Sequence, residues 1–143
     1  MERPSTRLDP DLVAAYGATL YRVYATTPFT LRIGEHSPEL AALHAHHGVE
    51  HSAFVSACNP LGQVLPPEDN ARRHADLRVT LQALGMAHIE GEGADPLGRW
   101  AAESSWLVLG LGRPGAESLG RSLQQNAIVW SRGDATPELV LLR

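Results

Sequence analysis

Glu103 is the residue in this sequence best placed for acid–base chemistry. It stands directly ahead of the strongly apolar segment 105–111, which the pattern predicts to be a strand. A carboxylate at the entry to a buried strand is partly desolvated, and desolvation favours a glutamate that can act as a general acid or base. We therefore predict Glu103 as the catalytic candidate.

Asn70 and Arg73 lie in the first half of a predicted long helix that begins at Pro67 and ends before Gly85. The inward stripe of this helix is apolar in its second half and becomes polar toward Asn70 and Arg73. Either the stripe reaches a polar pocket, where Arg73 holds an anionic group, or these side chains extend into solvent at the helix start.

Two amides flank predicted strands. Asn59 follows the segment 52–58, and Gln125 precedes the segment 127–130. Each amide can donate and accept hydrogen bonds to a ligand. The alternatives are that Asn59 caps the turn before Pro60 and that Gln125 satisfies a loop.

Glu90 opens a predicted loop over 91–100 that places three carboxylates around two glycines. Such a loop either supplies an acid–base group or oxygen ligands for a divalent cation, or it is a solvated turn. It lacks the spacing of an EF-hand. Four histidines between 44 and 51 lie near a predicted helix C-terminus, which favours histidine without any metal. We predict no metal site and no cofactor.

Composition excludes several kinds of chemistry. All 12 basic residues are arginine, so a lysine Schiff base and a phosphate-binding P-loop are both excluded. Cys58 is the only cysteine, and we read it as a buried strand residue. The net charge of −4 gives no general attraction to nucleic acid or to anionic membranes. Arg72, Arg73 and Arg78 form a short basic face, but no nucleic-acid-binding motif accompanies it.

The N-terminus lacks the apolar core of a signal peptide, and no apolar segment is long enough to span a membrane. We therefore expect a soluble cytoplasmic protein.

The apolar periodicity predicts an α+β fold. We expect one domain over 1–143 with a flexible arm at 1–10, and a mixed, mainly antiparallel sheet packed with about three helices in two or three layers. The predicted strands are 20–25, 29–33, 52–58, 87–90, 105–111, 127–130 and 139–142. The predicted helices are 38–47, 67–84 and 114–124, with a short opening helix at 11–17 that carries Leu12, Val13 and Tyr16 on one side.

Several motifs in this order resemble the bacterial domain of unknown function 3293 family. They span nearly the whole chain and include 31–34, 54–60, 68–70, 90–93, 100–104 and 125–130. Cys58 departs from the family pattern, which favours an aromatic residue there, and this argues against a nucleophilic role. The resemblance implies a bacterial cytoplasmic protein and implies no particular reaction.

Two hypotheses follow. In the first, polar residues at one end of the sheet line a pocket for a small polar or anionic ligand, and whether the domain is also an enzyme stays open. The residues are Asn59, Asn70, Arg73, Glu90, Glu103 and Gln125. In the second, the domain is a non-catalytic interaction module in which these residues form a structural network. Both leave the oligomeric state open. The first requires that Asn59, Asn70 and Glu103 approach one another.

Overall fold

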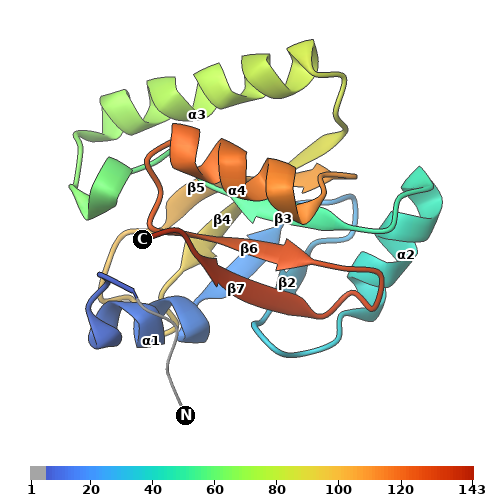
Figure 1. The fold of residues 1–143 in the computed structure, drawn as a ribbon, viewed down its shortest axis with the longest axis horizontal. Coiled ribbons are helices and arrows are strands. Elements are labelled where there is room, and N and C mark those ends of the chain that lie inside the picture. The colour runs from blue at the N-terminus through green and yellow to red at the C-terminus, as the bar shows by residue number, and fades with distance from the viewer. Residues whose placement is uncertain (1–5) are drawn as a thin grey trace.

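The protein is described by a computed structural model over residues 6–143, and its elements follow the predicted order (Figure 1). The helices are α1 (Pro10–Ala18), α2 (Pro38–His47), α3 (Pro67–Ala83) and α4 (Arg113–Ser122), with a 3-10 turn η1 at Pro60–Gly62. The strands are β1 (Leu20–Val23), β2 (Phe29–Leu31), β3 (Ser52–Val55), β4 (His88–Ala94), β5 (Glu103–Leu109), β6 (Ala127–Ser131) and β7 (Pro137–Leu141).

All seven strands form one sheet in the order β2-β1-β4-β5-β3-β6-β7. Each neighbouring pair is antiparallel. The predicted hairpin of β1 and β2 is present, with Tyr21 opposite Leu31. The α+β class and the mainly antiparallel sheet are confirmed, and the sheet contains no parallel pair among the described residues.

Two apolar clusters cover the two faces of the sheet and give three layers. On one face, Leu77 and Leu81 of α3 pack with Ala116 of α4 against Trp106 and other strand residues. On the other face, Leu40 of α2 joins a second cluster. Figure 1 shows α3 and α4 together on one side of the sheet, with α1 and α2 near its opposite ends.

The helix ends follow the local sequence. The Ser37 side chain accepts a hydrogen bond from the Leu40 N–H at 3.1 Å, and Gly48 ends α2 with a left-handed φ of 64°. In α3 the predicted inward stripe is buried at Leu77 and Leu81, but Leu84 follows the helix and is 63% exposed. Within residues 6–143, none of the helices has the length and apolar character that crossing a membrane requires.

Strand β5 lies inside the sheet, between β4 and β3. Every residue from Trp106 to Leu109 is buried. The uninterrupted apolar run therefore marks an interior strand with both faces covered, as its composition predicts. Glu103 is the first residue of this strand rather than part of the loop before it.

The predicted loop over 91–100 is wrong in its first part, because β4 continues to Ala94. Gly91 lies opposite Val23, and a Cβ built on Gly91 would stand 2.2 Å from the backbone oxygen of Arg22. The glycine permits a close approach of two strands here, whereas the sequence pattern treats glycine as a loop former.

The predicted arm at 1–10 falls partly on residues 1–5, which lie outside the described residues. Of the remainder, Leu8 is buried and Pro10 begins α1. The side chain of Asp9 caps this helix by accepting a hydrogen bond from the Asp11 N–H at 2.7 Å.

Candidate functional site

A cavity of about 300 Å³ lies between α1 and the face of the sheet opposite α3 and α4. Such a volume is at the lower end of the range for small-molecule sites. Aliphatic and aromatic side chains provide much of its wall, including Leu12, Phe54, Val64, Trp100, Val129 and Leu139. The side chains with polar atoms that line it are Tyr16, Thr19, Tyr21, Ser56, Asn59, Glu103, Ser105, Gln125 and Asn126.

Glu103 reaches this cavity because of its place in β5. Residues alternate between the two faces of a strand, so Glu103 shares a face with Ser105 and Leu107. Its carboxylate Oε2 accepts a hydrogen bond from the Asn59 side-chain nitrogen at 2.9 Å. Burial raises the pKa of Glu103, and the Asn59 hydrogen bond opposes that shift only in part. No arginine or histidine among the described residues forms an ion pair with it.

Asn59 is held by reciprocal hydrogen bonds with Asn70. The Asn59 N–H donates to Asn70 Oδ1 at 3.0 Å, and Asn70 Nδ2 donates to Asn59 Oδ1 at 2.8 Å. The same Asn59 oxygen accepts from the Leu65 N–H at 3.0 Å. Asn59 adopts a left-handed conformation with φ of 48°, which asparagine tolerates better than most residues. Asn70 thereby fixes the side chain that contacts Glu103, although Asn70 itself does not line the cavity.

Arg73 points to backbone carbonyls instead of to the cavity. Its Nε donates to the Ala57 oxygen at 2.5 Å and its Nη2 to the Leu123 oxygen at 2.8 Å. Arg73 is not among the lining residues. These bonds join α3 to the segments that follow β3 and α4, so the contacts of Arg73 are structural.

Gln125 lines the cavity from the segment ahead of β6. Its Nε2 donates to the Cys58 oxygen at 3.1 Å. The amide therefore connects the entry of β6 to the segment after β3, and it does so at the cavity wall.

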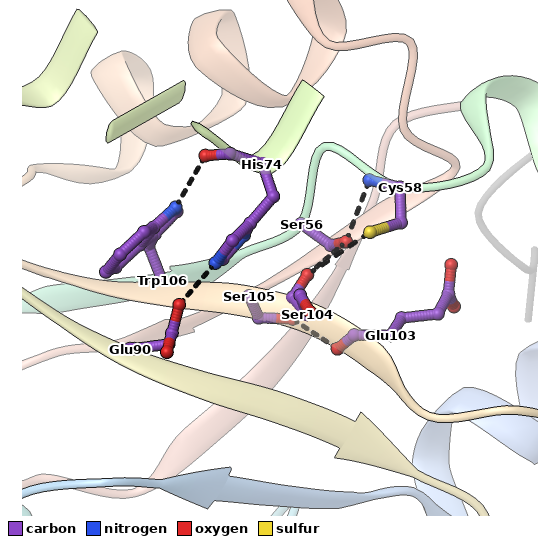
Figure 2. A network of polar contacts seen from close by, with 8 residues as sticks. All are labelled: Ser56, Cys58, His74, Glu90, Glu103, Ser104, Ser105 and Trp106. Carbon is purple, nitrogen blue, oxygen red and sulfur yellow. Dashed lines mark hydrogen bonds and ion pairs between the residues drawn. The ribbon is translucent and has the colours of Figure 1, made fainter. Parts of the chain in front are cut away.

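Glu90 lies on the other face of the sheet, where it is opposite Trp106. Its Oε2 is 2.7 Å from His74 Nε2, and the His74 ring stacks on Trp106 with centroids 4.4 Å apart. Figure 2 shows the Glu103 side chain directed away from the His74–Glu90 pair. The structure thus brings Asn59, Asn70 and Glu103 together and places Glu90 apart from them.

The other carboxylates near Glu90 have their own arginine partners. Glu92 pairs with Arg22 at 3.2 Å, and Asp95 pairs with Arg99 at 2.8 Å. The Arg99 guanidinium lowers the pKa of Asp95 to about 2. Within the described part of the chain, no three histidine, cysteine or acidic side chains are grouped to hold a metal ion.

Cys58 is buried and does not line the cavity. Its Sγ donates to the Ser104 oxygen at 3.5 Å (Figure 2). Burial raises the pKa of the thiol, which keeps it protonated at neutral pH and makes it a poor nucleophile.

Sequence reasoning missed Tyr16 and Asn126 as parts of one site. Asn126 Nδ2 donates to the Tyr16 hydroxyl at 3.2 Å across the cavity wall. Burial raises the pKa of Tyr16, so its hydroxyl keeps its proton and can donate it to a ligand. The sequence offered a tyrosine on the apolar side of the short opening helix and a second amide beside Gln125 at a strand entry, but nothing that joined the two.

A family model described as "Protein of unknown function (DUF3293)" matches residues 55–128. This span runs from the end of β3 to the start of β6, and it contains Asn59, Glu103 and Gln125. No curated protein and no solved structure matches the chain.

Proposed function

We propose that this chain, which belongs to the DUF3293 family, binds a small molecule in the cavity between α1 and the sheet, with Glu103 as its main polar contact. The bacterial and cytoplasmic setting expected from the sequence is part of the same proposal.

The observation that supports the proposal is the carboxylate of Glu103. Moving a charged group out of water costs free energy unless a partner compensates it. Glu103 has one neutral donor, Asn59, and no cationic partner among the described residues. An apolar side chain at this position would avoid the cost, so a ligand contact gives a reason for the carboxylate.

The arrangement also suits proton transfer. A raised pKa brings a carboxyl group closer to neutral pH, where it can accept a proton and return it. The Asn59–Asn70 pair fixes the orientation of that carboxyl group. If the domain is an enzyme, Glu103 is the acid–base residue that we propose.

A non-catalytic interaction module is the second candidate. It is supported by the hydrogen bonds that Asn59, Asn70 and Arg73 make to one another or to backbone groups, because such bonds stabilise loops. This explanation gives no role to the cavity itself, or to a carboxylate in it that has no cationic partner among the described residues.

The two candidates can be separated with protein purified from its native cells. We expect electron density for a bound molecule in the cavity of crystals, together with a small-molecule hit in a thermal-shift screen. Gly93 lines the cavity, and a Cβ there meets Thr19 and Tyr21 only at ordinary contact distances of 3.5 Å or more. Gly93→Ala should therefore fold and weaken the hit.

The matched control is Gly17→Ala, because a Cβ on Gly17 meets no atom within 4 Å and Gly17 does not line the cavity. An empty cavity, no hit from a diverse library, and equal behaviour of the two variants would favour the interaction module instead.

A further inference from the structure

The ligand class can be inferred from the charge and shape of the cavity. We propose that the cavity selects a small organic cation: an amine with an apolar body, whose protonated nitrogen pairs with Glu103. This inference rests on the proposed function, since it names the kind of molecule that the cavity binds.

The first argument is the charge of the residues that line the cavity. Among the described residues that line the cavity, Glu103 is the only aspartate, glutamate, arginine or histidine. Arg73 is turned toward the Ala57 and Leu123 carbonyls, and Arg143 donates to Asn126 Oδ1 at 2.9 Å without lining the cavity. A bound anion would meet a carboxylate and no cationic side chain from the described residues of the wall, whereas a cation would meet an opposite charge.

The second argument is that the Glu103 carboxylate can accept further hydrogen bonds. An ionised carboxylate has two oxygens and about four acceptor positions. Among the described residues only Asn59 donates to it, and only to Oε2. Oε1 therefore remains for a ligand N–H group. A charged donor is a better partner than a neutral one, because charge-assisted hydrogen bonds are roughly twice as strong.

Asn59 holds the Glu103 carboxylate in an orientation that leaves Oε1 available to the ligand. Its side-chain oxygen is already bonded to Asn70 and to the Leu65 N–H, so its Nδ2 is directed at Glu103. A carboxylate fixed in this way loses little rotamer freedom when a ligand binds, and preorganisation of this kind increases affinity.

The rest of the wall describes the body of the ligand. Phe54, Trp100 and Val129 give apolar surface, and aromatic faces attract ammonium groups as well as hydrocarbon. A volume of about 300 Å³ is at the lower end of the range for small-molecule sites, so the ligand is small. A single ring with a short aminoalkyl chain is of that size.

Isothermal titration with three probes of nearly equal size tests the proposal. The probes are 2-phenylethylamine, which is cationic at neutral pH, 2-phenylethanol, which is neutral, and phenylacetate, which is anionic. We expect the amine to bind at least about tenfold more tightly than the alcohol, and phenylacetate to bind most weakly.

Glu103→Gln tests whether the carboxylate is the cause. The glutamine oxygen can still accept from Asn59, so the variant removes the charge and keeps this contact. Amine affinity should fall by about tenfold or more, and affinity for the alcohol should change by no more than about twofold. Glu35→Gln is the matched control, because Glu35 is exposed and does not line the cavity; it should change neither affinity.

The failure of this inference differs from failure of the proposed function. Tighter binding of the alcohol or of phenylacetate, or equal amine affinity of wild type and Glu103→Gln, overturns the cation class and leaves a binding cavity in place. No measurable binding of the amine also overturns the cation class. Only the diverse library, compared between Gly93→Ala and Gly17→Ala, decides whether the cavity binds small molecules at all.

Discussion

At the residue scale, Asn59 determines how the polar cluster is organised. It uses its backbone N–H, its side-chain oxygen and its side-chain nitrogen to contact Asn70, Leu65 and Glu103. Its left-handed backbone places these groups, and most residues other than glycine, asparagine and aspartate are strained in that conformation. Asn59 therefore contributes both to stability and to the position of the carboxylate.

Two substitutions separate the effect of the Asn59 side-chain hydrogen bonds on stability from the effect of its backbone conformation. Asn59→Ala should lower the free energy of unfolding by about 2–4 kcal/mol, because it loses several part-buried hydrogen bonds and adds backbone strain. Asn59→Gly loses the same bonds but fits the left-handed conformation, so it should be more stable than Asn59→Ala by about 1 kcal/mol. Urea unfolding of both variants measures the difference. Equal stability of the two would show that the conformation carries no strain.

Glu103→Gln should leave the fold intact, with unfolding free energy at neutral pH unchanged or raised by up to about 1 kcal/mol. Burial raises the pKa of Glu103 above its ordinary value of 4.5, so the folded state binds the proton more tightly than the unfolded state does. The stability linked to this proton is complete below pH 4.5 and is lost as the pH rises through the raised pKa.

Urea unfolding of wild type and Glu103→Gln across this pH range should show that loss only in the wild type. If Glu103→Gln instead lost roughly 3 kcal/mol or more at neutral pH, Glu103 would be part of a structural network.

The sequence predicted part of this site for a physical reason. The polar half of the α3 stripe and the strand-end positions place Asn59, Asn70 and Glu103 close together, and the structure confirms their approach. Glu90 could not be assigned in the same way. The face of the sheet on which Glu90 lies depends on where β4 runs and on the pairing of Glu90 with Trp106. The apolar pattern of one strand does not give its register with a neighbouring strand.

At the element scale, β4 shows how two glycines in one strand differ. An added Cβ on Gly91 would stand 2.2 Å from the β1 backbone oxygen of Arg22 and 3.0 Å from the Phe54 ring. Gly93 faces the cavity and has room for a methyl group. A run of alternating glycines looks like a loop in sequence, because the approach of a neighbouring strand cannot be seen there.

Gly91→Ala should therefore destabilise the protein by roughly 3 kcal/mol, since backbone of β1 must move to relieve the clash. Gly93→Ala should change the unfolding free energy by less than about 1 kcal/mol. Thermal melts of both variants test this contrast. Similar stability of Gly91→Ala and Gly93→Ala would mean that β1 and β4 are not as close as described.

Helix α2 is attached to the sheet through a buried histidine. His44 Nε2 lies 2.8 Å from Ser52 Oγ of β3, and both residues are buried. Burial, and to a smaller extent His51, lowers the pKa of His44 from its ordinary value of 6.5. The folded state thus favours the neutral imidazole.

Stability should decrease as the pH falls below 6.5, because the unfolded chain takes up the proton first. The decrease should be at most about 1.4 kcal/mol per pH unit, and it ends when the folded-state pKa of His44 is reached. His44→Gln offers an uncharged partner to Ser52 and should flatten this dependence relative to His46→Gln, since His46 is exposed. The free energy of unfolding of both variants is measured by urea unfolding at several pH values below 6.5. If it fell equally steeply with pH in the two variants, His44 would not be the cause of the decrease.

At the scale of the whole molecule, the cavity depends on segments that are far apart in sequence. Tyr16 of α1 meets Asn126 near the entry of β6 at 3.2 Å, and Gly93 of β4 lines the same space. The sequence predicted the class of fold and most elements from periodicity. It could not show that α1 packs over the cavity face of the sheet. That arrangement depends on the strand order β4-β5-β3-β6, which brings distant segments of the chain together.

The most direct test of a small-molecule cavity is a two-dimensional amide NMR titration of the labelled protein with a diverse fragment library. We expect at least one fragment to shift the amide signals of Tyr16, Glu103 and Asn126 together, because these residues surround one space. The response should weaken in Gly93→Ala and persist in Gly17→Ala. If no fragment shifts these signals together, or if Gly93→Ala responds like Gly17→Ala, the cavity is not a binding site.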